Sequence, residues 1–172
     1  MKLNLRCCTL QDLGQLVKIS LETFIAAFEK DNDQDDFTAY INSAFSSEKL
    51  ASEIKNPNTW FYFVLDEKEI VGYFKLNRGD AQSDIKDDQS LELERIYVIQ
   101  SYQGKGIGHW ILDQTKQIAK KQQIHHIWLG VWEKNQAAIR FYQRHGFKKF
   151  GTHPYYIGKD KQTDWLMQSD IQ

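Results

Sequence analysis

The residues best placed for chemistry form a glycine-rich turn directly after an apolar segment. Residues 91–99 read LELERIYVI, and residues 103–108 follow as QGKGIG. This pattern is typical of a strand that ends in a tight turn and opens a helix. Backbone N–H groups in such a turn lie at the positive end of the helix dipole, where they bind phosphate groups. Gly104, Gly106 and Gly108 favour such a site because glycine adopts positive φ and leaves room for close approach.

Two common phosphate-binding motifs do not fit this turn. A P-loop needs Ser or Thr after its Gly-Lys pair, whereas Gly104-Lys105 is followed by Gly106. A dinucleotide-binding fingerprint needs G-x-G-x-x-G, and here the third glycine, Gly108, comes one residue early. The spacing that fits is Q-x-x-G-x-G, starting at Gln103. A single turn of this kind is, by itself, more often an ordinary connection between a strand and a helix.

Carboxylates lie close to this turn in the sequence, and others form a separate acidic run. Glu92 and Glu94 are two residues apart, so both are expected on one face of the strand. They could take up a proton or hold a cation, although a solvated strand face would look the same. Residues 29–36 contain five carboxylates and one lysine. We single out Asp33 and Asp36 there as candidate ligands for a polycation, against the more common alternative of a solvated loop.

The overall composition limits the partners. Lys and Arg (22) nearly cancel Asp and Glu (23), which argues against nucleic acid. No stretch approaches the roughly 18–20 apolar residues of a membrane span, and the histidines lack the spacing of a metal site. The adjacent Cys7 and Cys8 form no disulfide framework, and no signal peptide is visible, so we expect a cytoplasmic protein. At 172 residues we expect one domain, 1–172, either monomeric or homodimeric.

The elements that must position these residues follow from hydrophobic periodicity and turn signals. We expect strands at 3–7, 60–65, 70–76, 91–99, 127–132, 147–150, 155–157 and 164–168. Helices are expected at 13–28, at 37–54, from 107 to about 123, and after Asn135, with Gly146 just past the end of the last. Residues 29–36 and 77–89 are expected as loops. This order predicts a mixed α/β fold built around one sheet.

The turn and a second motif together resemble a known family, the Gcn5-related N-acetyltransferases, which transfer acetyl from acetyl-CoA to amines. The second motif runs from Asn135 through Ala138 and Phe141-Tyr142 to Gly146-Phe147. This resemblance implies a mainly antiparallel sheet, flanked by helices, that splays after its fourth strand. Residues 22–24, 81–83, 91–97, 128–135 and 162–164 are similar, more narrowly, to bacterial spermidine/spermine acetyltransferases of the PaiA type.

The resemblance also implies roles for individual residues. Acetyl-CoA would be the co-substrate, and no metal would be needed. The residues expected to bind it are Ile96, Tyr97, Val98, Gln103, Gly104, Lys105, Gly106, Ile107, Gly108, Asn135, Ala138 and Tyr142. A backbone N–H near Val98, where the strand 91–99 ends, would stabilise the developing oxyanion. Tyr142 would protonate the leaving thiolate, although its position also suits a core aromatic residue. Asn135 would hold the pantetheine arm, cap the last helix, or do both.

The acceptor implied by the narrower resemblance is a polyamine, spermidine or spermine. Glu94 would anchor its ammonium group and accept its proton through a water, with Glu92 beside it as a second ligand. Direct attack within a ternary complex would need no acyl-enzyme. The alternatives are another amine (a protein amine, a diamine or a small xenobiotic amine) and a CoA-binding sensor without catalytic activity.

Overall fold

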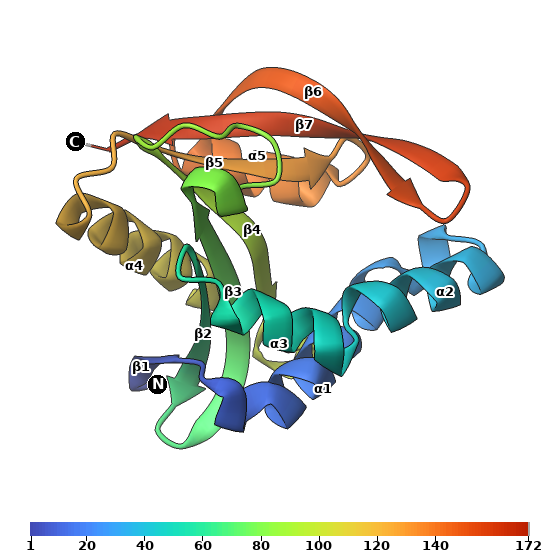
Figure 1. The fold of residues 1–172 in the computed structure, drawn as a ribbon. Helices are drawn as coiled ribbons and strands as arrows, with labels where there is room; N and C mark the ends of the chain where they lie inside the picture. Colours follow the sequence, from blue (N-terminus) through green and yellow to red (C-terminus); the bar gives the residue numbers. More distant parts are fainter. Residues whose placement is uncertain (172) are drawn as a thin grey trace.

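The computed structural model describes residues 1–171 as a seven-stranded sheet with helices on both faces (Figure 1). Its strands are β1 (Leu3–Cys7), β2 (Thr59–Asp66), β3 (Glu69–Arg78), β4 (Ser90–Val98), β5 (His126–Trp132), β6 (Lys148–Ile157) and β7 (Asp160–Asp170). Its helices are α1 (Leu13–Phe28), α2 (Gln34–Ala44), α3 (Ser47–Lys55), α4 (Ile107–Lys121) and α5 (Gln136–Arg144). The strand order is β1-β2-β3-β4-β5-β7-β6, and β4–β5 is the parallel pair. The predicted mixed, mainly antiparallel α/β sheet is therefore confirmed.

Apolar side chains divide between the two faces of the sheet. On one face, α4 and α5 pack against the strands through residues such as Ile107, Ile111 and Ile139. On the other, α1 and α3 pack against β2 and β3 through residues such as Leu16 and Leu50. An aromatic cluster joins α1 and α2 to the end of β6. Helices therefore pack on both faces of the sheet.

The sheet opens between β4 and β5. These strands pair over three residues, from Ser90 opposite His126 to Glu92 opposite Trp128. Beyond that point β4 continues against β3, and β5 continues against β7, so the two strands diverge. The expected splay after the fourth strand is confirmed. It leaves one edge of β4, from Leu93 to Val98, without a neighbouring strand.

Two expectations about the helical segment were wrong. Residues 37–54 do not form one helix, because α2 ends at Ala44 and the Ser46 side chain caps a new helix by accepting from the Lys49 N–H at 3.2 Å. The acidic run 29–36 is not a loop throughout. Residues 29–31 form a short 3-10 helix, and Asp33 caps α2, whose first turn includes Asp36. Capping serine and aspartate side chains thus outweigh the simple hydrophobic period.

The last strands and the polar segment before β4 also differ from expectation. Residues 148–150 and 155–157 belong to one strand, β6, which passes Pro154 and follows β7 with an irregularity near Gly151, while Phe147 lies just before this strand. Proline is tolerated there because β6 is the edge strand of the sheet. Within residues 77–89, Asn77 and Arg78 extend β3, and residues 79–81 form a 3-10 turn.

None of the helices in residues 1–171 is long and apolar enough to cross a membrane. The same residues contain no group of three or more His, Cys, Asp or Glu side chains arranged to hold a metal ion. That the whole chain 1–172 forms one domain stays a prediction.

Candidate active site

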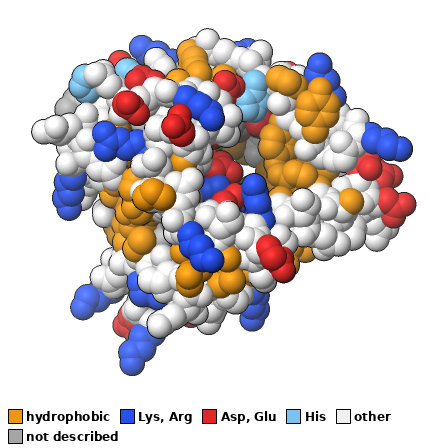
Figure 2. Space-filling model, viewed as in Figure 1, with side chains coloured by type: hydrophobic (Ala, Val, Ile, Leu, Met, Phe, Trp, Pro, Cys, Tyr) orange, Lys and Arg blue, Asp and Glu red, His pale blue; other side chains and the backbone are white. Residues whose placement is uncertain are grey.

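The divergence of β4 and β5 opens a cleft of about 730 Å³. Figure 2 shows the molecule hollowed near the middle of one face, with acidic and basic side chains inside and hydrophobic ones along a side. We call one part of the lining the turn side, formed by residues 102–104, 106–109, 135, 137, 138, 141 and 142. The hairpin side is formed by α1 and the β6–β7 hairpin, with Phe24, Phe28, Tyr155, Gln162 and Asp164. Residues 93–98 of β4 run between the two.

The glycine turn has the geometry of an anion site. Gly104 and Gly106 have φ of +75° and +82°, which side chains rarely adopt, and an added Cβ at either would meet nothing within 4 Å. The Trp110 N–H makes the first helical bond, to the Gly106 carbonyl, so the N–H groups of the preceding turn have no helical acceptor. At Gly108 a Cβ would come within 3.3 Å of Phe141, so this glycine lets α4 and α5 approach. The open cradle fits a pyrophosphate.

The free edge of β4 leads into this turn. The Ile99 N–H donates to the Val71 carbonyl at 2.9 Å, so by strand alternation the Val98 N–H points the other way, into the splay. At the end of β4, the Gln103 side-chain amide donates a hydrogen bond to the Val98 carbonyl at 3.0 Å. One backbone donor beside the glycine turn is thus available to a bound molecule.

Tyr142 is held at the cleft by the end of α5. The Phe147 N–H donates to the Tyr142 carbonyl at 3.0 Å, and Gly146 takes a φ of +87°, forming the predicted glycine stop of the helix. Burial raises the pKa of the Tyr142 phenol, so the group keeps its proton. At the other end of α5, the Asn135 side chain accepts from the Ala138 N–H at 3.2 Å. The capping role of Asn135 is confirmed, and both residues line the cleft.

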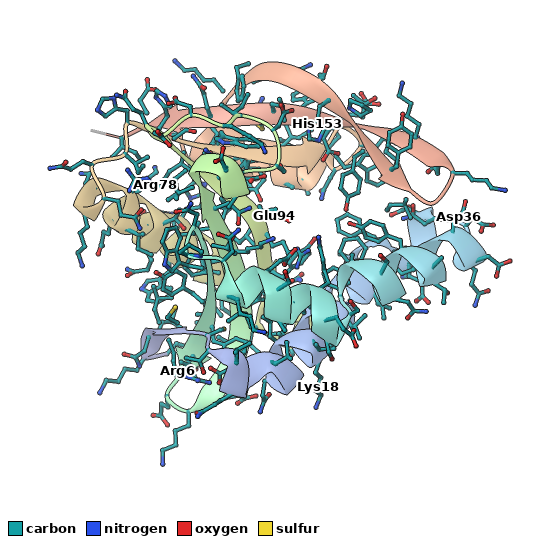
Figure 3. All side chains as sticks on the ribbon, in the orientation of Figure 1. Arg6, Lys18, Asp36, Arg78, Glu94 and His153 are labelled. Carbon is teal, nitrogen blue, oxygen red and sulfur yellow. The ribbon has the colours of Figure 1, made fainter. Side chains whose placement is uncertain are left out.

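A β-bulge aims Glu94 into the cleft. Lys75 lies opposite Arg95 and Leu76 opposite Leu93, which leaves Glu94 as the extra residue of β4. Bulges redirect side chains in this way. Glu94 lies near the centre of the molecule in Figure 3, between β4 and α3.

Glu94 is a charged, partnered carboxylate. It pairs with the Lys75 ammonium at 2.5 Å and accepts from the Asn77 amide at 2.6 Å. Lys75 also pairs with Glu53 of α3 at 3.1 Å, so the cluster ties the cleft to that helix. Burial alone would raise the pKa of Glu94, but the positive charges of Lys75 and Arg95 hold it below its ordinary value. Glu94 therefore keeps its negative charge.

Glu92 lies beside Glu94 but has a different environment. The Asn77 amide bonds both carboxylates, which confirms that they share one face. Glu92 is 2% exposed, does not line the cleft, and accepts from the Ser83 N–H at 2.8 Å and from the Ser83 hydroxyl. Burial, and then the charge of Glu94, raises its pKa. Glu92 thus anchors the loop after β3.

Three other candidate residues lie outside the cleft lining. Lys105 places its ammonium over the Tyr102 ring, 4.8 Å from its centre. Asp33 caps α2 by accepting from the N–H groups of residues 35 and 36 at 3.0 and 3.1 Å. Asp36 accepts from the Lys159 N–H at 3.3 Å and lies at the edge of the molecule in Figure 3. All other residues proposed to bind the co-substrate line the cleft.

One cleft residue, Asp164, was missed as a site candidate. It lies on β7 opposite Trp132, and its carboxylate reaches across to Gly130, where an added Cβ would be 3.3 Å from Oδ2. In the sequence, residues 162–164 contribute to the family resemblance, and Asp164 begins the predicted strand 164–168. Two features of the sequence could have pointed to Asp164 as a site residue. Asp164 is a carboxylate in a strand that continues as Trp-Leu-Met, and Gly130 is a glycine inside the apolar strand 127–132. Such a glycine often marks a close approach.

The fold and the cleft agree with the comparison to known families. The model of the acetyltransferase (GNAT) family matches residues 16–147, and the chain belongs to this family. It is an N-acetyltransferase that uses acetyl-CoA. The glycine turn and the splay lie within the part of the chain that this family model matches.

Individual relatives add detail. An uncharacterized N-acetyltransferase of Lactobacillus delbrueckii subsp. lactis is 37% identical over 94% of this chain and 93% of its own length. A spermidine N(1)-acetyltransferase of Thermoplasma acidophilum is 26% identical over 86% of this chain and 89% of its own length. The PaiA N-acetyltransferase of Thermoplasma acidophilum, solved in complex with coenzyme A, has the same fold, with a TM-score of 0.78 at 23% identity and 99% coverage of both chains.

Proposed function

We propose that this enzyme acetylates a primary amine of spermidine or spermine, by direct attack of the amine on acetyl-CoA within a ternary complex. The observation that carries the proposal is the carboxylate pair, Glu94 and Asp164, lining a cleft whose other end is the glycine turn. A cation with spaced ammonium groups suits such a lining. The similarity to a spermidine N(1)-acetyltransferase supports the same substrate class.

The turn side holds the acyl donor in this proposal. Acetyl-CoA supplies an activated acetyl group, whose carbonyl oxygen becomes negative during attack. The Val98 N–H points into the splay and can stabilise that charge; one such donor is typically worth about 3 kcal/mol of barrier. Residues of the glycine turn bind the pyrophosphate through their free N–H groups. Asn135 adds a polar group beside the pantetheine path.

Tyr142 holds the proton that the leaving thiolate needs. Its raised pKa keeps the phenol protonated at neutral pH. A thiol has a pKa of about 8.5, so proton transfer from a phenol is uphill but feasible within hydrogen-bond reach. A position on α5, fixed at both ends by caps, suits a group that must stay in place.

Glu94 anchors the substrate ammonium in this proposal. Its lowered pKa keeps it charged, which favours binding a cation. The same lowered pKa makes it a weak proton acceptor, because an efficient base has a pKa near the working pH. The proton of the amine must therefore pass to water beside Glu94 or to another group.

The test is release of CoA thiol from acetyl-CoA with a panel of acceptors: spermine, spermidine, putrescine, lysine and a peptide with a free N-terminus. Turnover with spermidine and spermine at the highest kcat/KM is expected. The same fold also occurs in a ribosomal-protein-S18-alanine N-acetyltransferase of Escherichia coli. The panel therefore includes a peptide, to test whether a protein amine is the acceptor. Preference for the peptide or lysine would replace the polyamine assignment. CoA binding without turnover of any amine would favour a sensor.

A further inference from the structure

We propose that Asp164 takes the proton from the incoming amine and that His153 passes it toward Asp84 and solvent. The proposal rests on the proposed function, because it concerns the amine acceptor in the same cleft. Asp164 belongs to β7, His153 to β6, and Asp84 to the segment between β3 and β4. The three side chains therefore come together from distant parts of the sequence.

Asp164 is placed where an acceptor can reach it. It lines the cleft on its hairpin side, while Glu94 lines it from β4. Gly130 lacks the side chain that would otherwise cover the carboxylate. An amine lying between β4 and β7 can thus be held by Glu94 while it contacts the Asp164 carboxylate.

The surroundings of Asp164 suit proton exchange. Burial raises its pKa to about 6, His153 acts in the opposite direction, and Glu133 adds to the increase. Burial and, to a smaller extent, the charge of Asp164 raise the pKa of the Tyr40 phenol, so Tyr40 keeps its proton beside Asp164. Glu94, in contrast, is held charged by Lys75. Of the two cleft carboxylates, Asp164 is the one that gains and loses a proton most readily near neutral pH.

His153 connects Asp164 to the surface. Its Nδ1 lies 2.9 Å from Asp84 Oδ2, and its Nε2 lies 4.0 Å from Asp164 Oδ2. In the neutral ring, Nδ1–H donates to Asp84, so the lone pair of Nε2 faces Asp164. A separation of 4.0 Å exceeds a direct hydrogen bond, and a water or a small rotation of either side chain must close it. His153 lies in the β6–β7 layer of Figure 3.

The proton balance is simple. One N–H bond of the ammonium breaks, its proton joins the Asp164 carboxylate, and the nitrogen lone pair becomes free to attack. The proton then moves from Asp164 to Nε2 of His153, which gives an imidazolium between two carboxylates. Loss of the proton to solvent beside the partly exposed Asp84 restores the neutral ring. No electrons are transferred.

The first test compares two acceptors in Asp164→Asn protein. With an ordinary polyamine, we expect kcat/KM to fall roughly 10²-fold, the usual contribution of a general base. With a polyamine fluorinated beside the reacting amine, which is far less basic, the loss should shrink to less than about ten-fold, because little proton transfer is required. Asp170→Asn, on the same strand but outside the cleft, is the control. Equal losses with both amines would make Asp164 a binding group only and overturn the proposal.

The second test does not depend on activity. In protein labelled with 13C-aspartate, the Asp164 carboxyl signal, assigned by its absence from Asp164→Asn, should titrate near pH 6. His153→Gln should raise that value, because it removes a group that lowers the pKa of Asp164. An unchanged titration in His153→Gln would overturn the relay.

The two proposals can fail separately. If another amine than a polyamine is turned over, the Asp164→Asn comparison is repeated with that amine and a less basic analogue, so the proton-acceptor assignment is still tested. If polyamines are turned over but Asp164→Asn keeps full activity, the polyamine assignment stands and the role of Asp164 is rejected.

Discussion

The two sides of the cleft are built in different ways. The turn side uses mainly backbone groups from residues close together in sequence: a strand end, a glycine turn and a capped helix. The hairpin side uses side chains from α1, β6 and β7, and its carboxylate is linked through His153 to the segment before β4. The first needs particular glycines at particular spacing, whereas the second needs only side chains that meet in space.

This difference matches the chemistry that each side serves. A pyrophosphate is the same in every acetyl-CoA molecule, so a fixed row of N–H groups is sufficient to bind it. Acceptor amines differ in length and charge, and side chains on a hairpin and on helices can be exchanged without altering the sheet. Substitutions in the glycine turn should therefore affect CoA binding, and substitutions on the hairpin side or at Glu94 should affect the amine.

The largest effect is expected from Gly106→Val. The valine would be strained at a φ of +82° and would fill the cradle. Loss of two charge-assisted hydrogen bonds, each worth about 2 kcal/mol, should weaken CoA binding roughly 10³-fold. Gly146→Val, at a φ of +87° outside the cleft, shares the strain and serves as the control in calorimetric titrations. Equal CoA affinity in the two variants would refute the phosphate site.

Tyr142→Phe should show the next largest effect, confined to catalysis. Removing the proton donor should lower kcat by roughly 10²-fold, while the affinity for CoA stays within about two-fold because the ring still packs against Phe147. Tyr62→Phe, which removes a hydroxyl outside the cleft, is the matched control. Steady-state kinetics and CoA titration measure the two effects separately. A fully active Tyr142→Phe enzyme would remove Tyr142 from the mechanism.

The features that could be predicted from the sequence lie mostly on the turn side of the cleft, and those that could not lie mostly on the hairpin side. The glycine turn, Asn135 and Gly146 could be predicted because local spacing sets them, whereas the splay was expected only from the family resemblance. The pairing of Glu92 and Glu94 followed from strand alternation, but their different environments did not. The bulge at Glu94, the bond from Ser83 to Glu92 and the ion pair with Lys75 all depend on tertiary contacts.

The hairpin side was largely beyond prediction for the same physical reason. Asp164 and His153 face each other only because β6 and β7 pair in one register, and Asp84, which bonds His153, lies 69 residues before it in the sequence. The error in residues 37–54 has another cause. The apolar pattern continues through Phe45, and only the Ser46 cap divides the segment.

Glu94→Gln should act on the amine rather than on CoA. Because the amide removes a charge-assisted hydrogen bond to the ammonium, the KM for polyamine should rise about ten-fold or more, with CoA affinity unchanged. Glu92→Gln is the matched control, because it makes the same substitution two residues earlier on β4 and outside the cleft. It should alter the KM for polyamine by less than about three-fold. Acceptor kinetics at saturating acetyl-CoA check both. A larger effect at Glu92 would exchange the two roles.

The smallest effect concerns Asp33, for which the sequence indicates a polycation ligand and the structure shows a helix cap. Asp33→Ser keeps a capping oxygen but loses the charge, whereas Asp33→Ala loses both. If capping is its role, only Asp33→Ala should lower the free energy of unfolding, by about 1 kcal/mol, and both variants should keep the KM for spermine. If its charge attracts the substrate, both should raise that KM equally, more at low salt. Denaturant unfolding and kinetics at two ionic strengths distinguish these outcomes. A rise in KM shared by both variants would extend the acceptor site beyond the cleft to the start of α2.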